Sequence, residues 1–135
     1  MDEEYKKLRA GWIVGERGRE GALRLLFLSW MHWADPPGVT GMDDDPEAAN
    51  LWHAIFAHFD GEASSDPEFL YIASIMAVVA GWGLGDEDEW SAAAERLRTR
   101  LLQIRPEGFT PDAFKGRGEY GRYFAHQATS RPRGE

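Results

Sequence analysis

The stretch Asp66-Pro-Glu-Phe-Leu-Tyr-Ile-Ala-Ser-Ile-Met-Ala-Val-Val-Ala-Gly-Trp82 decides the fold. Asp66 is a favourable N-cap residue, Pro67 suits the first helical position, and Glu68 places an acid near the positive end of a helix. The 14 residues from Phe69 to Trp82 are almost wholly apolar. Such a run is too short to cross a bilayer and is typical of a buried helix. We therefore expect residues 67–82 to form a central core helix.

Further helices flank this segment on both sides. Helical periodicity, cap signals and proline or glycine stops predict them at residues 2–14, 21–34, 46–60, 86–104 and 119–128. No long stretch alternates apolar and polar residues, so no strand is expected. The sequence predicts an all-α, single-domain bundle of five to six helices over residues 1–128, followed by a loose C-terminal tail at 129–135.

The composition limits the chemistry that the chain can carry. The 135 residues include no cysteine, which excludes disulfides, thiolate metal sites and cysteine nucleophiles. Five of the first seven residues are charged, and this segment lacks the apolar region of a secretory signal. We expect a soluble, cytoplasmic protein with no membrane partner.

Charge is distributed very unevenly along the chain. The net charge is -8, yet residues 25–95 contain no Lys or Arg and hold 14 Asp and Glu. This acidic middle disfavours nucleic acid and favours a basic partner, a cation or simple solubility. Five basic residues near the C-terminus could fold back on the acidic middle or meet an acidic partner: Lys115, Arg117, Arg122, Arg131 and Arg133.

Two acidic groups are candidates for contact with a partner: Asp43, Asp44 and Asp45, and Asp86, Glu87, Asp88 and Glu89. Each group precedes or opens a predicted helix, where the helix dipole stabilises an anion. Helix capping and solubility are the simpler explanation of these acids. We expect the acids in general to lie in loops and first turns, hydrated, with no desolvated carboxylate among them.

The histidines and serines do not form a recognisable catalytic or metal site. His53 and His58 are five residues apart and so lie on different sides of a helix, unlike a metal-binding pair at i and i+4. We expect His32 to be a hydrogen-bonded packing residue and His53 a hydrated surface residue. Ser29 and Ser74 are expected to bond to the preceding helical turn. No catalytic residue, metal ligand or cofactor is predicted.

One loop has a shape that suits a small ligand. Pro36 and Pro37 stiffen the chain after the helix that carries Trp30 and Trp33, and Trp52 follows in the next helix. These residues could wall a binding cleft. The alternative is a rigid corner beside tryptophans that belong to the core.

Three classes of function remain open. The first is a non-catalytic module, like an inhibitor or antidote, that engages a basic protein through its acidic residues. The second is a self-associating structural subunit, and the third is a small-ligand binder or enzyme with a Trp-lined cleft. The sequence favours the first, because the acidic segment is its most distinctive feature and no catalytic arrangement accompanies it.

Overall fold

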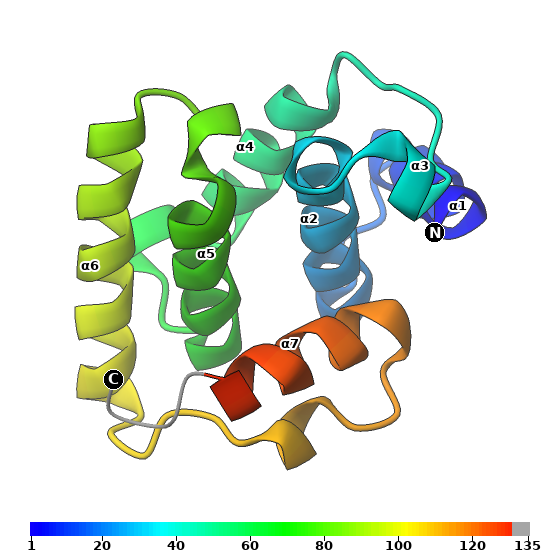
Figure 1. Ribbon diagram of the computed structural model, residues 1–135. Helices are drawn as coiled ribbons and strands as arrows, with labels where there is room; N and C mark the ends of the chain where they lie inside the picture. The colour runs from blue at the N-terminus through cyan, green and yellow to red at the C-terminus, as the bar shows by residue number, and fades with distance from the viewer. Residues whose placement is uncertain (131–135) are drawn as a thin grey trace.

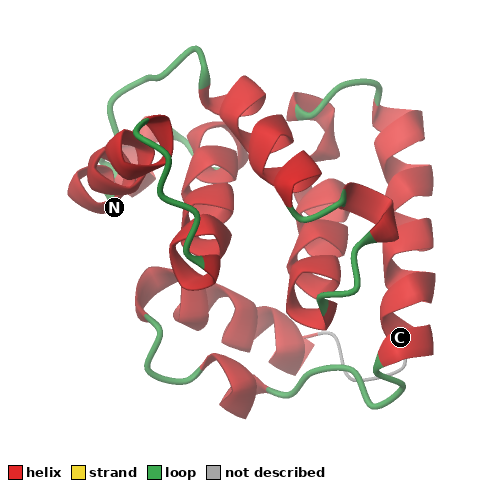
Figure 2. Ribbon diagram, turned by 180° about the vertical axis from the view of Figure 1, so that it is seen from behind, coloured by secondary structure: helices red, strands yellow, loops and turns green. Residues whose placement is uncertain are grey.

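The computed structural model describes residues 1–130, which form a helical bundle (Figure 1). Within these residues there is no strand (Figure 2), and no helix is both long and apolar enough to span a membrane. The elements are α1 (Asp2–Ile13), α2 (Arg19–Ala34), α3 (Pro37–Thr40), α4 (Ala48–His58), η1 (Gly61–Ala63), α5 (Pro67–Ala80), η2 (Gly81–Gly83), α6 (Glu87–Ile104), η3 (Pro111–Phe114) and α7 (Gly118–Ser130), where η marks a 3-10 turn.

The predicted all-α class is confirmed. The described chain holds seven α-helices rather than five or six, because four residues of the expected loop after Pro36 form the short helix α3. Helix α5 lies between α6 and α2, and α7 crosses the end of the bundle where α5 begins (Figure 1). Asp66 caps α5 as predicted, since its carboxylate accepts hydrogen bonds from the amides of Glu68 and Phe69 at 3.1 and 3.3 Å.

Tryptophans from α2 and α4 hold the C-terminal half of α5. The indole of Trp30 donates to the carbonyl of Met76 at 3.1 Å, and that of Trp33 donates to the carbonyl of Ala80 at 3.0 Å. The indole nitrogen of Trp52 lies 3.2 Å from the sulfur of Met76. Trp30 and Trp52 are fully buried. They are therefore core side chains with satisfied N–H groups, and they do not wall an open cleft.

Several helix boundaries differ from the predicted ones; for example, α2 begins at Arg19 rather than at residue 21, and α5 ends at Ala80 rather than at residue 82. Helix α4 begins at Ala48, because the Asp45 carboxylate accepts from the Glu47 amide at 2.9 Å in a turn that precedes the helix. Helix α7 continues to Ser130, past the predicted end at residue 128. The remainder of the predicted tail, residues 131–135, lies outside the described residues.

Because α5 fills the centre of the bundle, its buried positions should dominate stability. Ile72 is fully buried, whereas Val78 on the same helix is exposed. Ile72→Ala should lower the free energy of unfolding by about 2–5 kcal/mol, through lost apolar burial and the cavity left behind. Val78→Ala should change it by less than about 0.5 kcal/mol. Urea unfolding of both variants measures this, and equal losses would show that α5 is not central.

Candidate functional site

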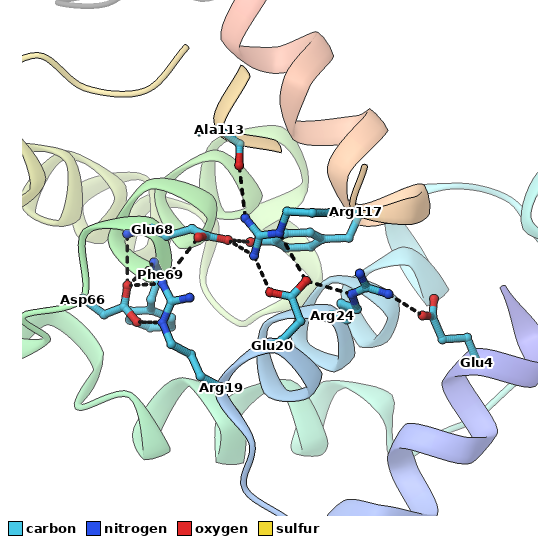
Figure 3. A network of polar contacts seen from close by, with 10 residues as sticks. Glu4, Arg19, Glu20, Arg24, Asp66, Glu68, Phe69, Ala113 and Arg117 are labelled. Atoms are coloured by element: carbon cyan, nitrogen blue, oxygen red, sulfur yellow. Dashed lines mark hydrogen bonds and ion pairs between the residues drawn. The ribbon is translucent and has the colours of Figure 1, made fainter. Parts of the chain in front are cut away.

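A buried carboxylate lies where α5, α2 and the start of α7 meet (Figure 3). Glu68, in the first turn of α5, is only 8% exposed. Its Oε2 accepts a hydrogen bond from the buried Tyr120 hydroxyl and lies 2.7 Å from Nη2 of Arg117. Nη2 of Arg19 lies 3.4 Å from its Oε1. The expectation that all acids are hydrated is therefore wrong for Glu68, because α7 covers this turn.

The same cations extend the network to other elements. Arg117 also binds Glu20 at 2.5 Å and donates to the carbonyl of Ala113 at 3.3 Å. Arg24 forms one ion pair with Glu20 at 3.0 Å and a second with Glu4 of α1 at 3.2 Å (Figure 3). Arg117 is one of the five basic residues near the C-terminus. The sequence left open whether these residues contact the acidic middle of the chain or an acidic partner, and Arg117 contacts the acidic middle at Glu68.

The network shifts the ionisation of its members. The hydrogen bond from Arg117 lowers the pKa of Glu20. Burial alone would raise the pKa of Asp66, but hydrogen bonds from Arg19 and from the amides at the start of α5 outweigh it and lower that pKa. Burial and the neighbouring Glu68 carboxylate raise the pKa of Tyr120, which keeps its hydroxyl protonated as a donor. Because Glu68 is occupied by these partners, the cluster acts as a structural clamp between helices.

Two of the four histidines, His32 and His53, are partly buried, whereas His58 and His126 are exposed. His32 donates from Nδ1 to the carbonyl of Leu28 at 2.8 Å, which confirms its predicted role. His53 was expected at the hydrated surface, and that prediction is wrong. Its Nε2 lies 2.8 Å from the carbonyl of Leu84, and its ring packs between Trp52 and Trp90. The carbonyl of Leu84, in the loop after η2, thus reaches this partly buried side chain of α4.

Helical serines bond as predicted, and the described chain offers no metal cluster. Ser29 donates to the carbonyl of Leu25, and Ser74 donates to that of Tyr71, each at 2.7 Å. Among residues 1–130, no three or more His, Asp or Glu side chains are grouped so that they could hold a metal ion.

The first predicted acidic group is largely neutralised by α1. Asp43 binds Lys6 at 2.7 Å. Asp45 binds Arg9 at 2.9 Å and accepts from the Tyr5 hydroxyl at 2.6 Å. Asp44 is exposed, and within residues 1–130 it has no ion pair. This group is thus mainly a docking point for α1, with one acid left facing solvent.

The second predicted acidic group keeps its charge. Asp86 caps α6 by accepting from the amide of Glu89 at 2.9 Å. Glu87, Asp88 and Glu89 are exposed and form no ion pair in the described part of the chain. The loops that carry the two predicted groups lie at opposite ends of the same edge of the molecule, with the start of α4 between them (Figures 1 and 2).

We call this edge the acidic edge and define it by the acids there that lack an ion pair within residues 1–130: Asp35, Asp44, Glu47, Asp86, Glu87, Asp88 and Glu89. Glu47, Asp86 and the three acids in the first turn of α6 lie at helix N-termini, where the dipole favours them. Asp35 follows the C-terminus of α2, where the dipole opposes an anion. Helix stabilisation therefore does not account for the whole edge.

An exposed tryptophan accompanies these acids. Trp82 in η2 is 58% exposed, and Val78 and Val79 in the last turn of α5 are 52% and 43% exposed. The turn lies directly on Trp33, because a Cβ added to Gly83 would come within 2.2 Å of that ring. Sequence reasoning placed Trp82 at the end of a buried helix and missed its exposure. The glycines on either side of it were the available signal.

A separate open groove of about 350 Å3 lies between η3 and the first turns of α7. Phe114 and Ala125 contribute its apolar lining, and Lys115, Arg117 and Arg122 contribute basic groups. Two of these cations are already paired, Arg117 with Glu20 and Glu68, and Arg122 with Glu119. The groove therefore offers little free positive charge.

Comparison with protein-family models, with curated proteins and with solved structures finds no match to this chain. The arrangement of its own residues is accordingly the basis for a functional proposal.

The clamp around Glu68 should be essential to stability. Arg117→Met leaves a buried carboxylate with one weaker cation partner and should lower the free energy of unfolding by about 3 kcal/mol. Arg122→Met removes an exposed pair with Glu119 and should cost less than about 1 kcal/mol. Chemical denaturation at neutral pH compares the two, and similar losses would contradict the clamp.

The same variant should change the acid sensitivity of the protein. Glu20 has a lowered pKa in the folded state, so its stabilising effect is complete above its unfolded value of 4.5 and is lost as pH falls through the folded pKa. Wild-type stability should therefore fall as the pH drops below about 4.5, and Arg117→Met should show a shallower fall. Parallel slopes in denaturation curves would argue against the Arg117–Glu20 contact.

The close approach of η2 to Trp33 gives a steric prediction. Gly83→Ala places a methyl group against the Trp33 ring and should lower the free energy of unfolding by about 1–3 kcal/mol. Gly38→Ala is the matched control, because a Cβ at Gly38 meets nothing within 4 Å. Thermal unfolding measures both, and an unaffected Gly83→Ala would mean that the turn does not lie on Trp33.

Proposed function

We propose that this chain is a non-catalytic binding module that engages a basic protein through its acidic edge. The observation that carries the proposal is the clustering of unpaired acids at one edge of the segment between residues 25 and 95. Elsewhere in this segment, five acids have cation partners within residues 1–130, namely Asp43, Asp45, Glu62, Asp66 and Glu68, and two isolated exposed acids, Asp60 and Glu95, have no ion pair there. The seven acids of the acidic edge have none, and so their charge is available to a partner.

The electrostatics of such an edge suit association with a cationic surface. Adjacent acids at Asp86–Glu89 are closer together than the Debye length of about 8 Å at physiological salt, so their fields add. A field of one sign steers an oppositely charged partner and raises the association rate. Asp35 adds a negative charge where its own helix gains nothing from it, which favours a role in binding over a role in folding.

Features expected of the competing functions receive less support. A carboxylate for general acid or base catalysis should be desolvated yet open to a substrate. Glu68 is desolvated, but Tyr120 and Arg117 occupy it. A Trp-lined cleft by Pro36 and Pro37 would need accessible walls, whereas Trp30 and Trp52 are buried.

Charge neutralisation at the acidic edge tests the proposal. The variant D86N/E87Q/D88N/E89Q keeps a good helix cap, because asparagine caps as well as aspartate. The control E3Q/E16Q/E107Q/D112N removes the same charge from exposed acids elsewhere. Wild type and control should capture the same basic protein from source-cell lysate at about 50 mM salt and release it at about 300 mM. The edge variant should capture at least tenfold less.

Two results would contradict this function. Equal loss of capture by the control variant would show that net charge matters and the acidic edge does not. A captured partner whose retention is indifferent to salt would remove the electrostatic basis of the interaction. Static light scattering on the same samples identifies self-association, which would appear as capture of the chain by itself.

A further inference from the structure

Most of helix α5 is buried, but its last turn exposes apolar side chains to solvent. Phe69, Leu70, Ile72, Ala73 and Met76 are fully buried in this helix, yet Val78 and Val79 face solvent, and Trp82 follows them in η2. Val78 and Val79 lie in the last turn of α5, and Trp82 lies in η2, after the backbone leaves helical geometry at Ala80 (φ -145°, ψ 52°). We call Val78, Val79 and Trp82 the apolar patch. An exposed tryptophan within such a patch is typical of an interaction site.

The patch is held in place before any partner arrives. Trp33 donates to the carbonyl of Ala80 at 3.0 Å and packs against Gly83. His53 donates to the carbonyl of Leu84 at 2.8 Å. These contacts anchor the backbone on both sides of Trp82 to α2 and α4. Because the backbone that carries Trp82 is already fixed, binding does not have to order it, and burial of the patch contributes more fully to affinity.

The charge beside the patch selects the kind of partner. Asp86, Glu87, Asp88 and Glu89 follow Trp82 by four to seven residues, and Asp35 follows the helix that carries Trp33. An anionic membrane surface and nucleic acid would both be repelled here. A partner segment that buries Trp82 must carry apolar side chains for the patch and cations for the neighbouring acids.

We propose that the apolar patch receives a basic amphipathic helix of the partner protein, with Lys or Arg side chains facing Asp86–Glu89. This inference rests on the proposed function and names the class of partner. An amphipathic helix carries apolar side chains on one face with cations beside them, which matches an exposed apolar patch followed by acids. An extended peptide that adds to a sheet finds no edge, because residues 1–130 contain no strand.

Two synthetic peptides of about 18 residues and equal positive charge test this proposal. One is a Lys/Leu amphipathic helix, and the other replaces every leucine with serine. By calorimetry at low salt, wild type should bind the amphipathic peptide at least tenfold more tightly than the polar one. Trp82→Ser should abolish that difference and leave binding of the polar peptide unchanged. Val78→Ser should reduce it and serves as a second variant.

The control variant is Val14→Ser, which removes an exposed apolar side chain at the end of α1. It should preserve the tenfold preference, and circular dichroism checks that every variant is folded. A preference that survives Trp82→Ser, or is lost equally in Val14→Ser, overturns the inference. So does a wild-type dimer that Trp82→Ser dissociates, because a second copy would then cover the patch.

The outcome also separates this inference from the proposed function. Equal binding of both peptides, lost at moderate salt and in D86N/E87Q/D88N/E89Q, would leave the acidic edge as a charge-binding surface and refute the helix-binding patch. Failure of wild type to bind either peptide at low salt would refute both.

Discussion

The structure depends on one electrostatic constraint: the acidic middle of the chain, residues 25–95, contains no cation of its own. Every ion pair made with this segment must therefore come from the flanking parts of the chain. Helix α1 supplies Lys6 and Arg9, the start of α2 supplies Arg19, and Arg117 comes from the turn before α7. The need for a cation from outside the segment is greatest at Glu68, because a buried carboxylate without a cation and hydrogen-bond donors destabilises the fold. The two ends of the sequence are thus drawn onto the middle by charge as well as by apolar packing.

The same constraint explains why one edge stays negative. Arg117 and α7 cover the end of the bundle where α5 begins, and α1 reaches the loop at residues 43–45 (Figure 1). The C-terminal end of α5 and the start of α6 lie at the opposite end of the bundle from α7. Acids there remain without ion pairs among the described residues, and Trp82 is exposed beside them. The two ends of α5 therefore have different roles. The clamp around Glu68 fixes the first turn of this helix, and the proposed binding surface begins at its last turn.

Local signals allowed much of the fold to be predicted, and long-range contacts decided what was missed. Asp66 and Pro67 identified the start of α5 correctly, because capping depends only on the next three residues. Glu68 carries the same local signal, yet its burial depends on Tyr120, 52 residues away. The position of His53 likewise depends on Leu84. The acids of α6 were identified as candidates from charge alone, whereas Trp82 was not, since an apolar run does not reveal which of its members the other helices leave uncovered.

Amide hydrogen exchange, recorded for the free protein and for its complex with the amphipathic Lys/Leu peptide, locates the surface that receives a basic partner. The flanking parts of the chain pair with five acids of the acidic middle and leave the acidic edge as a cluster of acids without ion pairs among residues 1–130, so a basic partner should bind there. Exchange should slow on binding at residues 78–90, with little change in α1 or α7. Protection centred on α1 or α7, with residues 78–90 unchanged, would contradict binding at the acidic edge.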